Sequence, residues 1–221
     1  MVRLNNNQRP SVTLAGAMSL DGKIATRTGD SGISSPRDLR ALHKVRSTHD
    51  AVMIGVGTLL HDDPCLTVRH VKGKSPIRII VDSAARTPPN ARIFRPGSPG
   101  VIVAVSSHAS KERVDRLRQA GANVIPAGRN KVNLRTLLFR LHQLGIRSVL
   151  LEGGGTLNWS MVSNQLVDNI KLTVAPFIIG GSQATTLVDG DGVSKINQGI
   201  KFTPVSVRRQ GEEIVLSYRV K

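Results

Sequence analysis

Two short stretches contain residue types suited to binding phosphate and small anionic ligands, GTLLHDDPCLTVR at 57–69 and LEGGGT at 151–156. The second stretch follows an apolar run at 148–151 that predicts a strand, and it precedes 157–166, whose apolar spacing predicts a helix. Glycines at such a turn let backbone amides approach a phosphate, and the helix N-terminus adds about half a positive charge. We therefore predict a pyrophosphate cradle, with a plain tight turn as the alternative, at Gly153, Gly154, Gly155 and Thr156.

Other kinds of catalytic or metal site find little support in the residue pattern. The glycines fall late in the chain and lack the GxGxxG fingerprint of the Rossmann fold, which needs an acidic residue about 20 positions further on. The six histidines show no metal-like spacing, and the single cysteine, Cys65, excludes an internal disulfide and a multi-cysteine zinc site. We therefore predict no metal site and no catalytic histidine, and we interpret Cys65 as a small packing residue.

Length and composition favour one domain in a reducing compartment. With 221 residues, of which 39% are hydrophobic, the chain can bury one substantial core. We expect an N-terminal tail at 1–10 and a single domain at 11–221. The first residues lack the apolar run of a signal peptide, and no apolar run approaches the roughly 20 residues that span a bilayer. We therefore expect a cytoplasmic protein without a membrane segment.

The charge balance indicates anionic ligands. The chain has 31 Lys and Arg against 15 Asp and Glu, and its net charge of +16 attracts anionic small molecules and polyanions. The cations are dispersed along the sequence, however, and only 3% of the residues are aromatic, so few side chains can stack on bases. We expect no specific nucleic-acid binding, and we keep a basic nucleic-acid-binding protein as the alternative from a different class.

Strand and helix patterns alternate along most of the chain. Ser34-Ser35-Pro36 is a typical helix start, with Asp38 near the positive end of the helix dipole. A strand at 23–27 would form a hairpin with the strand before it, and the segment 55–63 is predicted to be a loop. Further strands are predicted at 12–18, 51–55, 77–81, 101–105, 123–125 and 148–151, and helices at 36–46, 111–120, 134–144 and 157–166.

The predicted elements define a fold class and a place for the site. Segments 170–175 and 205–220, with a turn at Gly211, are predicted to be antiparallel edge strands, and the prolines between 86 and 100 predict an extended surface crossing. The fold class is therefore α/β, with a mixed, mainly parallel sheet and helices on both faces. Ligands of such sheets bind outside the carboxyl ends of the central strands, so we expect one cleft that collects 55–63, 82–83, 106–107 and 152–156.

Five motifs together resemble the reductase of riboflavin biosynthesis. They follow the order and approximate spacing of that family: SLDGK at 19–23, GTLLHDDPCLTVR, IIVDS at 79–83, LEGGGTLN at 151–158 and LVDNIKLTVAPFIIGG at 166–181. The resemblance covers about residues 11–220 and is to the stand-alone archaeal and fungal form, and to the reductase half of the bacterial bifunctional deaminase-reductase. Nothing matches the deaminase zinc signature of HxE followed by PCxxC, so we expect no deamination.

The resemblance implies a fold, a reaction and a cofactor. The fold would be the three-layer fold of dihydrofolate reductase, and two copies would form a homodimer through the antiparallel C-terminal strands. The reaction would be the NADPH-dependent reduction of 2,5-diamino-6-ribosylamino-4(3H)-pyrimidinone 5′-phosphate to the ribitylamino product. The sugar would open to an imine at C1′ and receive a hydride from the nicotinamide, so the protein must align two carbons and exclude water.

The resemblance also implies roles for individual residues. Arg46 and Arg69 suit the 5′-phosphate, because a guanidinium forms paired, charge-assisted bonds to phosphate oxygens. Glu152, the implied catalytic residue, would accept hydrogen bonds from pyrimidine amino groups or take part in proton transfer. The implied cofactor contacts are Ala17, Thr58, Asp62, Ser83 and the turn at 153–156, and the implied substrate contacts are Ser31, Arg46, Leu66, Arg69 and Glu152.

Several of these residues have a structural alternative. Asp62-Asp63 before Pro64 is also a typical turn sequence, and Arg46 at a helix end would also complement the helix dipole. Arg69 would equally suit a solvated surface. Gly32-Ile33 stands where the family allows an aromatic residue, so stacking from that position is not expected. A basic residue must meet the 2′-phosphate of NADPH, and the sequence offers Arg86 and Lys111.

Two further enzymatic alternatives stay open. The same reduction could act on the deaminated compound, 5-amino-6-ribosylaminouracil 5′-phosphate, because Glu152 could recognise either ring. A reductase of the same fold could instead act on a dihydropterin. The set of Arg46, Leu66, Arg69 and Glu152 favours the riboflavin reductases over the dihydropterin enzymes.

Overall fold

The computed structural model describes residues 8–95 and 99–221, and the chain divides into two compact units. Unit 1 comprises Met1–Ser11 and Lys44–Leu150, and unit 2 comprises Val12–His43 and Leu151–Lys221. Each unit is thus assembled from two separate segments of the chain. This division does not test whether either unit folds alone, so the single domain at 11–221 stays a prediction.

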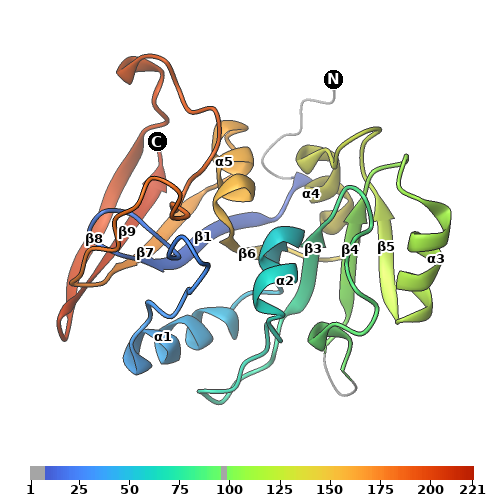
Figure 1. Ribbon diagram of the computed structural model, residues 1–221, viewed down its shortest axis with the longest axis horizontal. Helices are drawn as coiled ribbons and strands as arrows, with labels where there is room; N and C mark the ends of the chain where they lie inside the picture. Colours follow the sequence, from blue (N-terminus) through green and yellow to red (C-terminus); the bar gives the residue numbers. More distant parts are fainter. Residues whose placement is uncertain (1–7, 96–98) are drawn as a thin grey trace. The chain divides into compact units, whose positions relative to one another are not determined.

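Unit 1 is built on four parallel strands. They are β2 (Ala51–Gly55), β3 (Ile77–Val81), β4 (Val101–Val105) and β5 (Ala122–Pro126), hydrogen-bonded in the order β5-β4-β3-β2 (Figure 1). Their apolar runs are almost wholly buried, as expected of parallel strands that are covered on both faces. The predictions for these four strands are confirmed.

Three α-helices accompany these strands. Helix α2 (Val56–Asp62) packs on β2 and β3, α3 (Lys111–Gln119) packs on β5, and α4 (Leu134–Gln143) buries three leucines. A short 3₁₀ helix, η2 (Arg92–Phe94), interrupts the predicted extended crossing at 86–100, of which Pro96 lies outside the described residues. The predictions for α3 and α4 are confirmed, whereas the predicted loop at 55–63 is wrong, because these residues form α2.

Unit 2 combines parallel and antiparallel strand pairs. Strand β7 (Asn169–Val174) runs parallel to β1 (Ser11–Met18), and on its other edge it pairs antiparallel with β9 (Glu213–Val220). Strand β8 (Phe202–Gln210) forms a hairpin with β9, with Gly211 in the turn at a φ of +70°. The predicted C-terminal hairpin is confirmed, but 170–175 is not an antiparallel edge strand, because β1 occupies its second edge.

Three elements complete the chain. Strand β6 (Ser148–Gly153) leads into α5 (Gly155–Ser163), as predicted, although α5 begins two residues earlier than expected. Helix α1 (Pro36–Arg46) begins at the predicted serine cap, because the Ser35 hydroxyl accepts a 3.1 Å hydrogen bond from the Asp38 amide. A second 3₁₀ helix, η3 (Ile196–Gln198), lies in the segment before β8. In the described part of the chain, no helix is long and apolar enough to cross a bilayer.

The turn after β1 corrects the predicted hairpin at 23–27. Lys23 forms only an isolated bridge, to Thr186, and the Ile24 amide donates to the Thr185 carbonyl at 2.9 Å. The Asp21 carboxylate accepts hydrogen bonds from the amides of Ile179 and Gly180 at 3.1 and 2.8 Å. The segment after β7 therefore supplies the pairing partner that the sequence pattern had placed on β1.

Candidate functional site

The carboxyl ends of the unit 1 strands gather three of the four predicted loops. The parallel register places Gly55 of β2 beside Val81 of β3, and Val81 beside Ala104 of β4. Beyond the strands, the Ser106 amide donates to the Ser83 carbonyl at 3.1 Å. The segments after β2, β3 and β4 thus share one sheet edge, as predicted, while the joining of this edge with 152–156 in one cleft stays a prediction.

Helix α2 places two predicted cofactor contacts on one face. Thr58 and Asp62 are four residues apart in a helix, so their side chains lie on the same side. Thr58 is half-buried and Asp62 is exposed at the end of α2, where its carboxylate lies 3.9 Å from the His61 imidazole. Partial burial raises the pKa of the Asp62 carboxyl above its usual value, and the nearby His61 partly offsets this rise.

Asp63 has the structural role that the sequence offered as an alternative. It ends α2 in the left-handed conformation, with φ +39°, and its amide donates to the Leu59 carbonyl at 3.0 Å. Its carboxylate accepts a 2.9 Å hydrogen bond from the Arg92 amide. Asp63 therefore ends α2 and links it to η2, whereas Asp62 stays within the helix.

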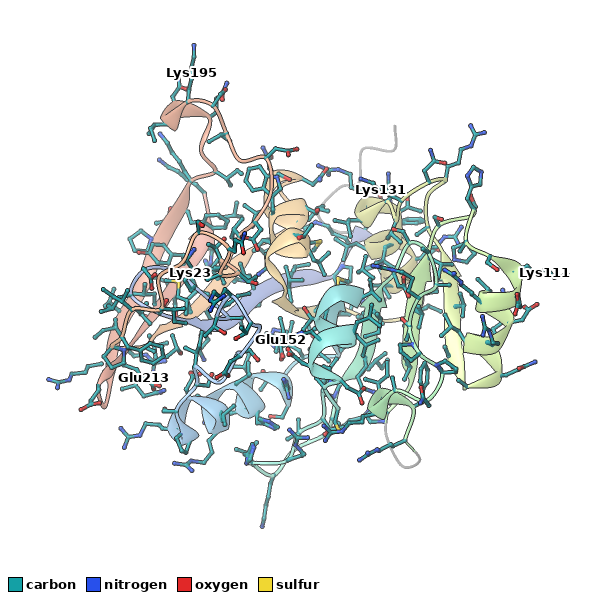
Figure 2. All side chains as sticks on the ribbon, in the orientation of Figure 1. Lys23, Lys111, Lys131, Glu152, Lys195 and Glu213 are labelled. Carbon is teal, nitrogen blue, oxygen red and sulfur yellow. The ribbon has the colours of Figure 1, made fainter. Side chains whose placement is uncertain are left out.

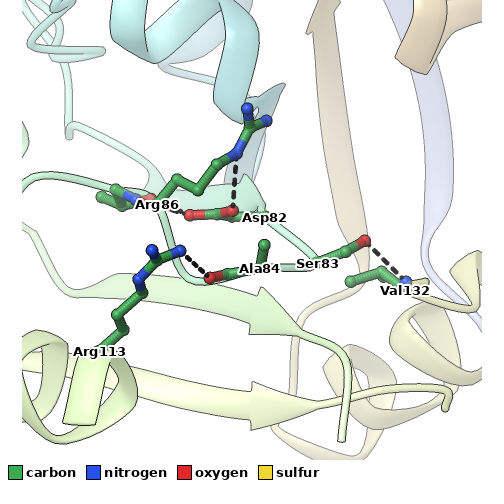
Figure 3. Close-up of polar contacts among 7 residues, drawn as sticks. Asp82, Ser83, Ala84, Arg86, Arg113 and Val132 are labelled. Atoms are coloured by element: carbon green, nitrogen blue, oxygen red, sulfur yellow. Dashed lines mark hydrogen bonds and ion pairs between the residues drawn. The ribbon is translucent and has the colours of Figure 1, made fainter. Parts of the chain in front are cut away.

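Ser83 lies directly after β3, where its side chain joins two loops (Figure 3). Its hydroxyl accepts a 3.0 Å hydrogen bond from the Val132 amide, in the loop between β5 and α4. A hydroxyl that accepts one hydrogen bond still has its own hydrogen to donate. Ser83 can therefore fix the loop and donate to a phosphate or ribose oxygen at the same time.

Two guanidinium groups flank the turn at 82–86 (Figure 3). The buried Asp82 carboxylate accepts hydrogen bonds from the Thr87 amide and hydroxyl, and it lies 4.0 Å from Nε of Arg86. On the other side, Nη1 of Arg113 donates to the Ala84 carbonyl at 3.4 Å. The sequence offered Arg86 but missed Arg113, because the approach of α3 to this turn leaves no local signal.

The remaining unit 1 residues converge on the segment after α2. Arg46 is buried at the end of α1, and its Nη1 donates to the Thr67 carbonyl at 3.2 Å. This bond places the guanidinium beside a segment that includes Leu66 and Arg69. Leu66 is buried in the core of unit 1 with φ +54°, so a ligand contact would come from its backbone, while Arg69 is exposed. Arg46 therefore does more than complement the helix dipole.

In unit 2, the glycine turn has the predicted strand-to-helix geometry. Gly153 ends β6 with φ +97°, a conformation that favours glycine, and its peptide bond to Gly154 is cis. Gly154 precedes the first residue of α5, and a Cβ at Gly155 would overlap the Asp189 carboxylate and the Thr186 carbonyl. Two of the three glycines are thus required, one by its conformation and the other by close packing, and Thr156 is exposed in the first turn of α5.

The sequence missed two residues that shape this turn. The buried Asn158 donates from Nδ2 to the Leu187 carbonyl at 2.8 Å, and the Asp189 amide donates to the Gly155 carbonyl at 3.1 Å. Oδ1 of Asn158 is buried and has no hydrogen-bond partner among the described residues. Asn158 could have been found in LEGGGTLN, but nothing in the pattern of 186–189 indicates that it packs on α5.

The other predicted residues of unit 2 lie on three different elements. Ala17 is half-buried on β1 beside Thr173 of β7, and Glu152 is half-buried on β6, next to the glycine turn (Figure 2). Ser31 is exposed in the loop before α1, where its carbonyl accepts a 2.8 Å hydrogen bond from the Ile33 amide. Their roles as ligand contacts stay predictions. Among residues 8–95 and 99–221, no group of three or more His, Cys, Asp or Glu side chains could hold a metal ion.

Comparison with known sequences finds relatives along nearly the whole chain. A family model described as the RibD C-terminal domain matches residues 10–216. The chain is 47% identical over 216 residues to a protein of Methanothermobacter thermautotrophicus named 2,5-diamino-6-ribosylamino-4(3H)-pyrimidinone 5′-phosphate reductase, covering 96% of this chain and 99% of that one. It is 39% identical to an Archaeoglobus fulgidus protein of the same name, covering 96% and 98%.

Comparison with solved structures finds the same group. Acinetobacter baumannii RibD matches with a TM-score of 0.81 and 28% identity over 97% of this chain, which spans 58% of the RibD chain. The riboflavin biosynthesis reductase of Saccharomyces cerevisiae matches with a TM-score of 0.77 over 99% of this chain and 93% of that one, and at 23% identity it bears on the fold alone. These similarities confirm the predicted fold class.

Proposed function

Since the chain belongs to the family of the RibD C-terminal domain, we propose that it reduces 2,5-diamino-6-ribosylamino-4(3H)-pyrimidinone 5′-phosphate to the ribitylamino compound with NADPH. Its close relatives are named as this reductase of riboflavin biosynthesis. The observation that carries the proposal is the 47% identity to one of them over nearly the full length of both chains. The names of the same relatives indicate an oxidoreductase that acts on a pyrimidine ribose phosphate.

Each unit, taken by itself, offers groups that suit part of a nicotinamide dinucleotide. At the glycine turn, backbone amides at the start of α5 can approach a phosphate, and the orphaned Oδ1 of Asn158 can accept a hydrogen bond from a ligand. In unit 1, Thr58, Asp62 and Ser83 offer hydroxyl and carboxylate groups on one sheet edge. The bound cofactor would supply the hydride.

Two arginines would bind the substrate, and one carboxylate would bind it and transfer a proton. Arg46 and Arg69 would bind the 5′-phosphate, since charge-assisted hydrogen bonds to guanidinium are among the strongest that a side chain makes. Glu152 would accept hydrogen bonds from the ring amino groups and hold or release the proton that accompanies reduction. Ala17, Ser31 and the backbone of Leu66 would line the remaining surface.

The preference for NADPH over NADH would come from Arg86 and Arg113. Both guanidinium groups flank the turn that carries Ser83, and the Arg86 side chain is 54% exposed beside the buried Asp82. Lys111 has no hydrogen bond or ion pair within the described structure. We expect the variant R86Q/R113Q to lose about tenfold or more in kcat/KM for NADPH and little for NADH, because only NADPH has the 2′-phosphate. R116Q on the same helix is the matched control, and an unchanged preference in R86Q/R113Q would contradict the assignment.

The reaction itself is tested by following NADPH absorbance with each candidate substrate. Faster turnover of the diamino compound than of its deaminated counterpart would support reduction before deamination. Faster turnover of the deaminated compound would keep the chemistry and reverse the order. Oxidation of NADPH only with dihydrofolate would move the protein to the dihydropterin reductases, and no oxidation with any of the three would overturn the reductase proposal.

The proposal includes a cytoplasmic homodimer with one domain at 11–221. In the described part of unit 2, β8 pairs only with β9, and its exposed valines, Val205 and Val207, are 58% and 64% accessible. An edge strand with unpaired backbone groups is a ready partner for a second copy. Light scattering should give twice the chain mass, and V207K should reduce it to a monomer. A monomeric wild-type protein would contradict this part of the proposal.

A further inference from the structure

Asp82 is a buried carboxylate that has no role in the proposed reaction. It directly follows β3, its side chain is fully buried, and it precedes Ser83, a predicted cofactor contact. One of its oxygens, Oδ2, accepts hydrogen bonds from the Thr87 amide and hydroxyl at 2.7 and 2.8 Å. The other oxygen, Oδ1, has no hydrogen-bond partner among the described residues. One half of the carboxylate therefore closes the turn at 82–87, and the other half does not.

The two hydrogen bonds to Thr87 do not require a charge at position 82. The side chain of an asparagine has the same shape, and its carbonyl oxygen could accept both bonds. Burying a carboxylate costs more free energy than burying an amide, unless a cation pairs with the carboxylate. Closure of the turn alone would therefore favour asparagine, so the charge of Asp82 indicates a second role.

Arg86 lies within ion-pair distance of the unpartnered oxygen. Its Nε is 4.0 Å from Oδ1 of Asp82, and the two residues are four positions apart in the same turn. In Figure 3, Nε of Arg86 faces Asp82, and the two terminal nitrogens of the guanidinium point away from it. The Arg86 side chain is 54% exposed, whereas that of Asp82 is buried. The carboxylate thus faces one nitrogen of the guanidinium and leaves the other two open to a ligand.

This orientation suits the binding of a phosphate group. A guanidinium binds a phosphate through two parallel N–H···O bonds, and an exposed arginine loses rotamer freedom when it makes them. A carboxylate that restricts the side chain through Nε reduces this loss without using the terminal nitrogens. The 4.0 Å between Nε and Oδ1 allows electrostatic attraction but is too long for a hydrogen bond. A small shift of Arg86 would therefore give Oδ1 of Asp82 its missing hydrogen bond when a ligand binds.

We propose that Asp82 is a positioning residue, which orients Arg86 toward the 2′-phosphate of the cofactor and so helps the protein to select NADPH over NADH. This role rests on the proposed function, in which Arg86 binds that phosphate. Asp82 does not contact the cofactor itself, because its side chain is buried. If Asp82 only closed the turn at 82–87, its loss would affect the binding of both cofactors alike.

The test uses two cofactor fragments that differ only in the 2′-phosphate, adenosine 2′,5′-bisphosphate and adenosine 5′-phosphate. Isothermal titration of the full chain gives the Kd of each fragment, so the measurement needs no turnover of a substrate. We expect the wild type to prefer the bisphosphate, and D82N to lose about three- to fivefold of this preference, the upper range for an ion pair with an exposed partner. In D82N/R86Q, the change at Asp82 should add nothing to the effect of R86Q, because the two residues act as one unit.

Three further variants separate orientation from folding. D115N removes a carboxylate that lies 3.0 Å from Arg118 in the same unit, and as the matched control it should stay within about twofold of the wild type. T87V removes one of the bonds that close the turn, and it should lower the melting temperature without changing the preference for the bisphosphate. D82S, which is also neutral, replaces D82N in the comparison if thermal unfolding shows that D82N does not fold.

Several results would overturn the role of Asp82. These are an unchanged preference in the neutral variants, additive losses from D82N and R86Q, or an equal loss of preference in T87V. Tighter binding of the bisphosphate by D82N would mean that the carboxylate only repels the 2′-phosphate. A wild type that binds both fragments equally would overturn the assignment of Arg86, and with it that of Asp82. A preference for the bisphosphate that D82N reduces, without any oxidation of NADPH, would support Asp82 and overturn the reductase proposal alone.

Discussion

Unit 1 and unit 2 position their candidate site residues in different ways. In unit 1, four parallel strands bring their carboxyl ends to one edge, so the segments that follow them meet there whatever their own sequences are. In unit 2, the glycine turn owes its shape to a distant segment, because Asn158 and Gly155 bond to residues 187 and 189. Topology therefore predicts a site of the first kind, whereas the second kind depends on tertiary contacts.

The two units also treat exposed carboxylates differently. In unit 2, the Ser19 hydroxyl and the amides of Ile179 and Gly180 lower the pKa of Asp21 to about 2, from an ordinary value of 3.8. In unit 1, partial burial raises the pKa of Asp62. At Asp21, hydrogen bonds to the ionised carboxylate hold the turn after β1 in place. At Asp62, the ionised carboxylate is destabilised by burial, so a hydrogen-bond donor on a ligand would stabilise it.

The largest effect should come from the glycine turn. Gly153 and Gly121 have similar φ values, +97° and +92°, but a Cβ at Gly121 would meet open space whereas one at Gly153 would lie 3.2 Å from Asn158. Both alanine variants should carry a similar backbone strain, about 1–2 kcal/mol. We expect G153A to lose about 100-fold or more in kcat/KM, because a small displacement of the turn misplaces the cofactor.

Steady-state kinetics with NADPH and thermal unfolding of both variants check this prediction. G121A should keep activity within about twofold of the wild type. If G121A and G153A lost activity equally, the glycine turn would have only a structural role.

An intermediate effect is expected at Arg46 in unit 1. R46Q should raise the KM for the phosphorylated substrate by about 10- to 100-fold with a smaller change in kcat, since a charged hydrogen bond contributes about 1.5–3 kcal/mol. The exposed Lys44 on the same helix provides the control K44Q. A fall in kcat without a change in KM would indicate that Arg46 only holds the segment at 66–69 through Thr67.

The smallest effects should separate the two carboxylates by pH. Because the pKa of Asp21 is lowered in the folded state, its contribution to stability is present above about pH 4 and is lost as the pH falls towards 2. D21N should therefore lower the melting temperature at neutral pH and show less loss than the wild type on acidification. For Asp62 the sign is reversed, since a raised pKa means that ionisation weakens the fold, and D62N should raise the melting temperature slightly above pH 5.

Thermal unfolding of both variants between pH 2.5 and 7 measures these effects. D191N, a change of the same charge on an exposed loop of unit 2, is the control. Parallel pH profiles for D21N and the wild type would contradict the assigned role of the Asp21 hydrogen bonds.

Much of the fold was predictable from the sequence, and the errors have identifiable causes. Apolar runs marked the strands of unit 1, and a serine cap marked the start of α1, because both signals are local. Residues 56–62 were predicted to be a loop, since a seven-residue helix with Val56 and Leu59 as its two buried residues offers little periodicity. Lys23 was placed in a hairpin because its real partner, Thr186, is more than 160 positions away.

The candidate site, like the fold, has features that local sequence predicts and features that only tertiary contacts set. Its residue types, the glycines at 153–155, and the order of strands and helices follow from the sequence itself, because backbone conformation and burial leave a mark on each short segment. The Ser83–Val132 bond, the approach of Arg113 to Ala84 and the packing of Asp189 on Gly155 were decided only by tertiary structure. Such contacts join residues that have no periodic relation along the chain, so no local pattern records them.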